Sequence, residues 1–206
     1  MKNGNMPFKG YRNVKMASKL IFDEVEHTYT INGKLIPSVS LIVGLILGDN
    51  YKGIPMHILN KASQFGSDVH KFIELYNETS ILEYKNDYKI LHCVSEWVRL
   101  SEEFDEIIES EQSVHYMELY AGTFDSIALK GKKRVLIDYK TTNKFHRERV
   151  TLQLNLYRIA YQWLTGKKID ELCCVWLPKH TRGKIIYLDI LEEYELIEKV
   201  EAILNE

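Results

Sequence analysis

Two aspartates and a lysine occur at spacings that could support metal-assisted hydrolysis. Asp138 and Lys140 close an apolar run, and because side chains alternate along a strand, both share one face. Asp125 lies thirteen residues before Asp138, and the tight turn at 130–133 predicts paired strands on which the two carboxylates face each other. Close carboxylates repel unless a cation lies between them, and their oxygens suit Mg²⁺ or Mn²⁺.

Such an ion would generate hydroxide and stabilise charge on a phosphoryl oxygen, while Lys140 could orient or deprotonate the attacking water. By itself, however, an Asp-x-Lys triplet is more often a surface ion pair in a hairpin. Three companion segments favour the chemical interpretation. They are Gly122-Thr123-Phe124-Asp125, Gln153-Leu154-Asn155-Leu156-Tyr157 and Phe65-Gly66-Ser67-Asp68-Val69-His70-Lys71-Phe72-Ile73-Glu74.

Taken together, these segments resemble the motifs of the PD-(D/E)XK nuclease superfamily, and in particular its RecB-like, phage-type exonuclease branch. The four matching patterns are G-x-x-D, hydrophobic-D-x-K-T, Q-x-x-x-Y and G-(T/S)-x-x-H-x-x-(I/L)-E. The resemblance covers roughly residues 64–189, and the stretch at 29–40 is similar to the start of phage-type exonucleases. It implies a restriction-endonuclease-like core around a mixed sheet.

The resemblance also implies a set of site residues. His70, Asp125 and Asp138 correspond to the metal ligands. Asp125, Asp138 and Lys140 correspond to the catalytic residues, and the carbonyl of Tyr139 to a further metal ligand. The expected cofactor is Mg²⁺ or Mn²⁺.

DNA binding is expected from a second group of residues. By the resemblance, Gln153 and Tyr157 would lie near the site and help place DNA, although Tyr157 could simply be a core residue. Lys132 and Lys133 in the turn, and Arg149 near a helix start, could contact phosphates without reading sequence. For the turn, the alternative is an ordinary solvated loop.

Other ionisable residues have simpler interpretations. A histidine on an amphipathic helix is usually packed or exposed, and the motif context alone favours a ligand role for His70. Glu74, one turn further on, could orient His70 or be an exposed charge. Glu111 and Glu118 are interpreted as solvated charges.

The surrounding pattern predicts an α/β (α+β) fold with a central mixed sheet flanked by helices. Residues 1–19 are expected to be a flexible arm, and residues 20–206 a single nuclease domain. Within it we expect a hairpin and helix (20–54), a nuclease core (55–190) and a C-terminal helix (191–206). The predicted strands are a hairpin over 20–36, followed by 107–116, 119–129, 134–139, 171–177 and 184–190. The predicted helices are 41–47, 55–77, 87–104, 148–164 and 192–204.

The composition narrows the classes of protein. Of 206 residues, 45% are hydrophobic and 27% charged, which excludes disorder as the main state. The apolar run at 41–47 is too short to span a bilayer, and residues 1–19 lack the apolar centre of a signal peptide. Three cysteines without a CxxC pattern argue against a disulfide framework or a cysteine-only metal site and favour a reducing cytoplasm.

Charge is unevenly distributed although the net value is only −2. Residues 96–118 carry eight acidic groups and one basic group (−7), whereas residues 130–149 carry eight basic groups and two acidic groups (+6). Adjacent blocks of this kind fit a polyanion site beside a metal site, or merely solvated faces.

The leading hypothesis is a metal-dependent DNA exonuclease that acts at DNA ends in phage or bacterial recombination, replication or repair. Its expected substrate is DNA with single- or double-stranded ends. Its expected protein partners are a single-strand annealing or single-strand binding protein and further copies of the chain, and no membrane is expected to be involved. The alternatives are a non-catalytic DNA- or partner-binding module with the same fold, and a restriction-type endonuclease. No GxxxxGK[ST] pattern occurs, so the sequence contains no helicase motor motif.

Overall fold

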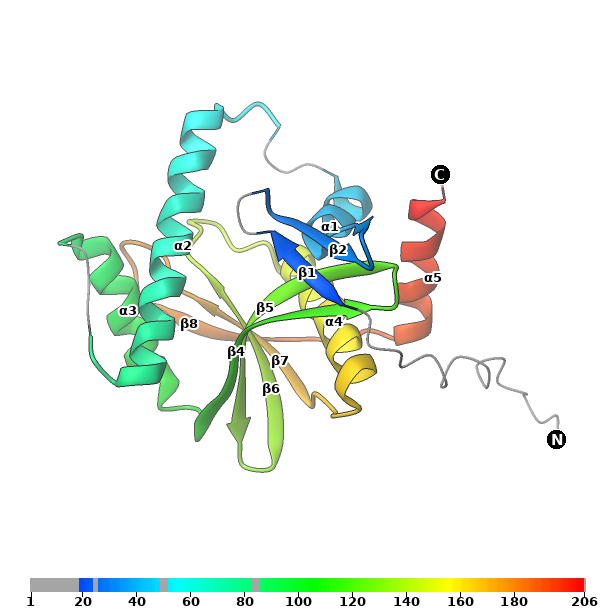
Figure 1. Cartoon of the computed structure of the whole chain (residues 1–206). Coiled ribbons are helices and arrows are strands. Elements are labelled where there is room, and N and C mark those ends of the chain that lie inside the picture. Colours follow the sequence, from blue (N-terminus) through cyan, green and yellow to red (C-terminus); the bar gives the residue numbers. More distant parts are fainter. Residues whose placement is uncertain (1–18, 24–25, 49–51, 83–85, 206) are drawn as a thin grey trace.

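The computed structural model describes residues 19–23, 26–48, 52–82 and 86–205, so residues 1–18 of the predicted arm lie outside the described part. Its centre is a five-stranded sheet in the order β4 (Glu106–Tyr116), β5 (Tyr120–Lys130), β6 (Lys133–Lys140), β7 (Glu171–Trp176) and β8 (Lys184–Leu188). β6 and β7 are parallel, and the other neighbouring strands are antiparallel. The predicted mixed sheet flanked by helices is confirmed (Figure 1).

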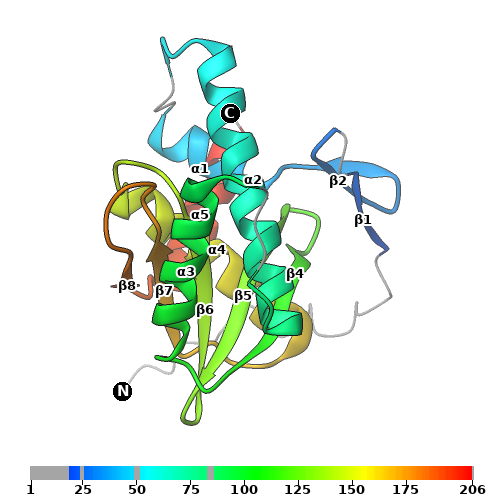
Figure 2. The same ribbon diagram turned by 90° about the vertical axis from the view of Figure 1, so that its left-hand side faces the viewer.

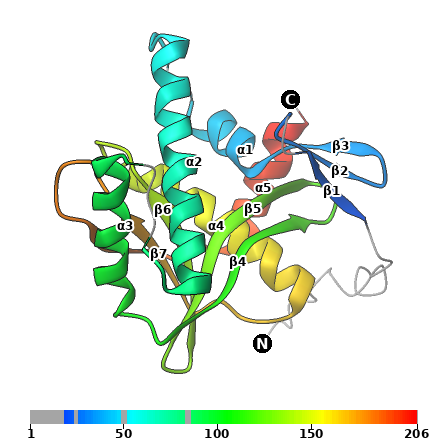
Figure 3. The same ribbon diagram turned by 60° about the vertical axis from the view of Figure 1, so that its left-hand side comes forward.

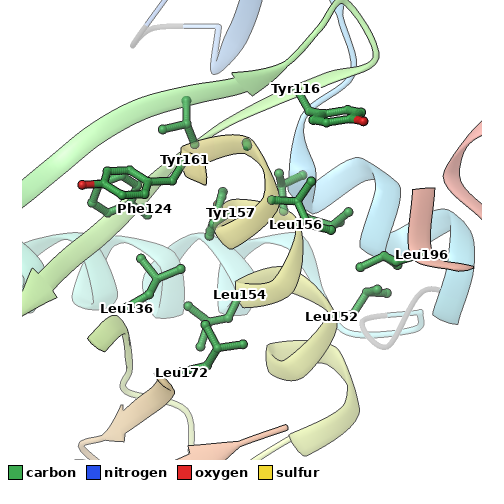
Figure 4. Close-up of a cluster of buried hydrophobic side chains, with 14 of the residues drawn as sticks. Tyr116, Phe124, Leu136, Leu152, Leu154, Leu156, Tyr157, Tyr161, Leu172 and Leu196 are labelled. Carbon is green, nitrogen blue, oxygen red and sulfur yellow. The ribbon is translucent and has the colours of Figure 1, made fainter. Parts of the chain in front are cut away.

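The parallel pair requires a crossover, which α4 (Arg147–Thr165) supplies between the end of β6 and the start of β7. Residues 135–139 of β6 are buried because helices cover both faces of the sheet. On one face, α4 contributes Leu154, Leu156 and Tyr157 to a large core together with Phe124 and Leu136 (Figure 4). This core holds the strand that carries the Asp-x-Lys triplet against a rigid helix.

The helices divide between the two faces of the sheet. α4 shares its face with α1 (Val39–Leu47) and α5 (Glu193–Leu204). The opposite face carries α2 (Met56–Thr79) and α3 (Tyr88–Ser101), which pack on β6 and β7 through a second core (Figures 2 and 3). Each helix matches a range expected from periodicity. The first turns of α2 are exposed and project beyond the sheet.

The N-terminal region forms a small sheet of its own. β1 (Leu20–Asp23), β2 (Thr28–Ile31) and β3 (Lys34–Ile36) are all antiparallel. Asn32 and Gly33 adopt φ values of 52° and 79°, as a two-residue hairpin turn requires. The predicted hairpin is therefore present, with β1 as a third strand.

The start of α1 is capped by a side chain, and the cysteines are unpaired. The Ser38 hydroxyl accepts a hydrogen bond from the Leu41 N–H at 3.1 Å and caps α1, which begins two residues before the predicted range 41–47. All three cysteines are free and buried. Among the described helices, none combines the length and the apolarity needed to cross a bilayer.

Candidate metal centre

The candidate centre forms where β5 and β6 separate. Ser126 pairs with Ile137, so the next positions, Asp125 and Asp138, stand opposite each other as the hairpin predicts. The strands then part, and the Tyr139 N–H donates to Asp125 Oδ2 at 2.6 Å instead of to a backbone carbonyl. Asp125 is thereby fixed at the opening of the sheet.

His70 approaches this opening from α2, on the face that also carries α3. Its Nε2 lies 3.0 Å from the carbonyl oxygen of Tyr139, and its Nδ1 lies 3.5 Å from Asp125 Oδ1. A neutral imidazole has one N–H and can satisfy only one of these two oxygens. The other ring nitrogen then presents a lone pair to an acceptor, an arrangement that a bound cation or a second proton would relieve.

Glu111 joins His70 and Asp125, and sequence reasoning missed it. One ligand atom from each of the three residues lies within 4.8 Å of the others. Although Glu111 is exposed as a residue, burial of its carboxyl and repulsion from Asp125 and Glu74 raise its pKa to about 8. Glu118, by contrast, remains an exposed charge and pairs with Lys34 at 3.4 Å.

Backbone geometry explains how Glu111 reaches the centre. The neighbouring pairs Ser110–Ser126 and Gln112–Phe124 place it opposite Asp125, and its φ of 47° is unusual for a strand residue. Knowledge of the turn between β4 and β5 would have identified this pairing from the sequence. The motif pattern does not include that strand.

Asp138 and Lys140 form the buried part of the centre. Lys140 Nζ donates to Asp138 Oδ1 at 2.7 Å, and the Asp138 side chain is only 2% exposed. Asp138 Oδ2 is buried without a hydrogen-bond partner among the described residues. Burial raises the pKa of Asp138 to about 6 even though Lys140 opposes the shift.

Lys140 remains a strong cation in this setting. Burial would lower the pKa of its ammonium group, but the charges of Asp138 and Asp125 more than offset that effect and raise the pKa above its ordinary value. In the metal-free protein Lys140 is therefore an ammonium ion and not a base.

Gln153 and Tyr157 lie on one face of α4, beside the same opening. Gln153 Nε2 lies 3.4 Å from the Tyr157 hydroxyl, and the Tyr157 ring packs so closely on Gly122 that a Cβ there would approach it to 2.6 Å. Burial raises the pKa of Tyr157, and the charges of Asp125 and Lys140 act on its hydroxyl. Tyr157 is thus a core residue whose polar end faces the centre.

With this geometry described, solved structures provide a comparison. A candidate exonuclease from Eubacterium rectale aligns with a TM-score of 0.51 and 15% identity, covering 82% of this chain and 77% of the other. The two chains share a fold. The protein SSO0001 aligns with a TM-score of 0.39 and 17% identity over 68% of this chain and 73% of its own, which is too weak to support an argument.

Comparison by sequence adds no family assignment. No family model matches the chain, and no curated protein is significantly similar to it. The likeness to the Eubacterium rectale protein shows a common architecture with a mixed sheet and flanking helices. The chemistry of the centre therefore rests on its own residues.

The lysines of the β5–β6 turn lie away from the centre. Lys133 begins β6, five residues before Asp138, a separation of roughly 17 Å along a strand. Lys133 forms an ion pair with Glu171, and Lys132 is exposed in the turn. The structure thus does not bring these two predicted DNA-binding residues to the cluster.

Arg149 lies near the start of α4, where it donates to the carbonyl of Gly48. A cavity of about 320 Å³ adjoins it, lined by Leu47, His146, Arg147, Glu148 and Arg149. Its guanidinium is therefore engaged in joining the end of α1 to the start of α4.

Proposed function

We propose that this chain is a divalent-metal-dependent DNA exonuclease of the RecB-like branch of the PD-(D/E)XK superfamily. The observation that carries the proposal is the buried Asp138 Oδ2, which has no hydrogen-bond partner in the described part of the chain while Oδ1 accepts from Lys140. A buried carboxylate oxygen without a partner is costly. Its position beside His70 and Asp125 gives that cost a functional explanation, because a cation bound there would satisfy it.

The donor set fits Mg²⁺ or Mn²⁺. The carboxylates of Asp125 and Glu111 in the three-residue cluster offer the oxygen ligands that both ions accept, and the His70 nitrogen favours Mn²⁺. Asp138, which lies outside that cluster but near Asp125, and the carbonyl of Tyr139 would add further oxygen ligands. When bound, the ion would lower the pKa of a water molecule and withdraw charge from the scissile phosphate.

The chain's own residues would complete the reaction. Lys140, as an ammonium ion held by Asp138, would stabilise negative charge growing on the phosphate oxygens. It could also donate a proton to the leaving oxygen. In the metal-free protein the raised pKa of Lys140 favours its ammonium form, and a cation that offsets the charges of Asp138 and Asp125 would lower that pKa again, so the role in orienting or deprotonating water stays a prediction.

Further aspects of the proposal follow from the motif resemblance. Gln153 and the Tyr157 hydroxyl would position DNA beside the ion. Strand ends would be the substrate, in phage or bacterial recombination, replication or repair within the cytoplasm. A single-strand annealing or single-strand binding protein, or further copies of the chain, would be partners.

Nuclease assays with matched DNA substrates test this proposal. End-labelled linear DNA, single- and double-stranded, and closed circles of the same sequence are incubated with Mg²⁺, Mn²⁺ or EDTA. We expect cleavage of linear DNA with either ion, none in EDTA, and none with the Asp138→Asn variant. Cleavage of circles would indicate an endonuclease, and binding without cleavage would indicate a non-catalytic module.

A further inference from the structure

The loop that joins β7 to β8, residues 177–183, lies at the same end of the sheet as the candidate centre (Figure 3). The Leu177 N–H donates to the carbonyl of Lys140 at 2.7 Å, so the loop begins beside the catalytic triplet. Lys179 Nζ lies 4.0 Å from the ring centroid of Phe65, which precedes His70 on α2 by about one helical turn. The loop therefore contacts β6 and α2, two of the four elements that supply the centre.

Hydrogen bonds from α3 fix the shape of this β7–β8 loop. The Gly183 N–H donates to Glu96 Oε2 at 2.8 Å, and the Gly183 carbonyl accepts from Arg99 at 3.1 Å. The Thr181 carbonyl lies 3.0 Å from Nε2 of His92. A loop that is ordered in advance loses little conformational entropy when it binds a ligand.

The β7–β8 loop is basic and exposed. It contains Lys179, His180 and Arg182 and no acidic residue, and His180 and Arg182 are exposed. The nearest acid on α3, Glu96, is occupied by Arg99 and the Gly183 N–H, which together lower its pKa. Within the described residues, neither Lys179 nor Arg182 forms an ion pair, so their charges are available to an anion.

The loop at the other end of β7 provides a contrast within the same strand. Lys167 pairs with Glu109 at 3.7 Å, and Lys168 pairs with Asp170 at 2.9 Å. Both lysines are exposed, yet each already has an acidic partner. Positive charge without an acidic partner thus lies at the end of β7 that borders the centre.

We propose that the β7–β8 loop binds the phosphate backbone of the DNA strand beside the candidate metal centre, with Lys179 and Arg182 contacting phosphates. The proposal rests on the proposed function, and it identifies the β7–β8 loop as a surface that the DNA substrate contacts. The Lys179 ammonium group lies over the Phe65 ring, which fixes it against the helix that carries His70. Backbone contacts are independent of sequence, which suits an enzyme that degrades ends of any sequence.

Salt-dependent binding tests the proposal. Fluorescence anisotropy of labelled single-stranded and duplex oligonucleotides is measured with Ca²⁺ between about 50 and about 200 mM salt. The test variant combines Lys179→Met, which keeps an apolar stem against Phe65, with Arg182→Ala. The matched control combines Lys167→Ala with Lys168→Ala and removes the same charge from the opposite end of β7.

The slope of log affinity against log salt is negative, and loss of two phosphate contacts should make it shallower, by about 1.4 for single strands and about 1.8 for duplex. Affinity should fall by on the order of tenfold or more, and the control should match wild type. The single variant Arg182→Glu, at an exposed position, should weaken binding without altering the melting temperature.

The outcomes separate this inference from the proposed function. If the test variant binds with the wild-type slope and affinity, the loop does not contact the backbone, whether or not the enzyme cleaves DNA. Equal losses in test and control variants would also overturn the inference, because the effect would then be net charge alone. If DNA binding by the wild-type protein depends on the loop but the protein does not cleave DNA with Mg²⁺ or Mn²⁺, the proposed function is wrong and the role of the loop in binding is still supported.

Discussion

The two ends of β6 carry ionisable groups in contrasting states. At the start of the strand, Lys133 pairs with Glu171, and the Arg134 N–H donates to Asp170 at 3.0 Å. At its end, Asp138 Oδ2 has no partner among the described residues, and His70 faces two oxygens with one N–H to offer if neutral. The carboxylate at the start of β6 is satisfied, because both oxygens of Asp170 have partners, and we call this the complete end although Arg134 Nε there is buried without a partner among the described residues. At the incomplete end a buried carboxylate oxygen lacks a partner.

This difference distinguishes charged residues that stabilise local structure by pairing with one another from charged residues whose polar atoms are free to bind a ligand. Exposed ion pairs contribute little to stability and tolerate substitution. Buried polar groups without partners cost free energy, and such groups in a native structure require an explanation. The basic block and the acids lie in the same part of the sequence, and the two ends differ in whether their carboxylate oxygens have partners.

Removing the ammonium group at the incomplete end should have the largest effect. We expect Lys140→Ala to lower DNA cleavage on the order of a hundredfold or more, because an ion at that position stabilises the transition state. Lys168→Ala, at the complete end, should retain wild-type rates. Single-turnover cleavage of an end-labelled duplex measures both, and equal rates would remove the distinction between the ends.

Metal binding at the incomplete end should raise the free energy of unfolding of the protein. Mn²⁺ at about a hundred times its dissociation constant should add about 2.7 kcal/mol to the free energy of unfolding. For a domain of this size that is a rise in melting temperature of about 5–10 °C. Asp125→Asn should remove most of the rise, and Glu118→Gln should leave it intact. Thermal melts with and without Mn²⁺ decide the matter, and identical shifts in all three proteins would place the ion elsewhere.

Much of the fold follows from the sequence because its signals are local. Helical periodicity identifies α2, α3, α4 and α5, and a short turn fixes β5 against β6 strongly enough to place Asp125 opposite Asp138. Motif order then indicates which helix delivers His70. These features depend on neighbouring residues or on one hairpin, so a pattern can capture them.

The remaining features depend on contacts between distant segments. Glu111 is an exception, because it reaches the centre through the register of the local β4–β5 hairpin, which the motif pattern does not include. Lys133 pairs with an acid on β7, which follows β6 only after an entire helix, so a run of basic residues could not show that this lysine already has a partner. Lys179 lies beside the centre only because β7 runs parallel to β6.

Two motif glycines should respond in opposite directions, which tests how tightly the incomplete end is packed. A Cβ on Gly122 would lie 2.6 Å from the Tyr157 ring, so Gly122→Ala should cost about 1–3 kcal/mol of stability. A Cβ on Gly66 would meet only Thr141 Oγ1 at 3.7 Å, and Gly66→Ala within α2 should gain about 0.5–1 kcal/mol. Urea unfolding measures both, and a neutral Gly122→Ala would show that Tyr157 can move aside.

The smallest effect should be a change in how stability depends on pH in the metal-free protein. The folded-state pKa of Glu111 is raised to about 8 from its ordinary value of 4.5, so between these values the folded chain keeps a proton that the unfolded chain has lost. Stability should therefore fall as pH rises through that window. Glu111→Gln removes this contribution, so its advantage over wild type should grow with pH.

Melting in EDTA from about pH 5 to about pH 8 measures the effect of Glu111, with Glu118→Gln as the control for loss of one acid from the same part of the sheet. Asp138 has a raised pKa as well, but it is present in every variant and its contribution cancels in the comparison. Mn²⁺ should reverse the trend in wild type, because an ion requires the ionised carboxylate. A pH-independent difference between Glu111→Gln and wild type would mean that the Glu111 carboxyl is solvated, and would remove it from the centre.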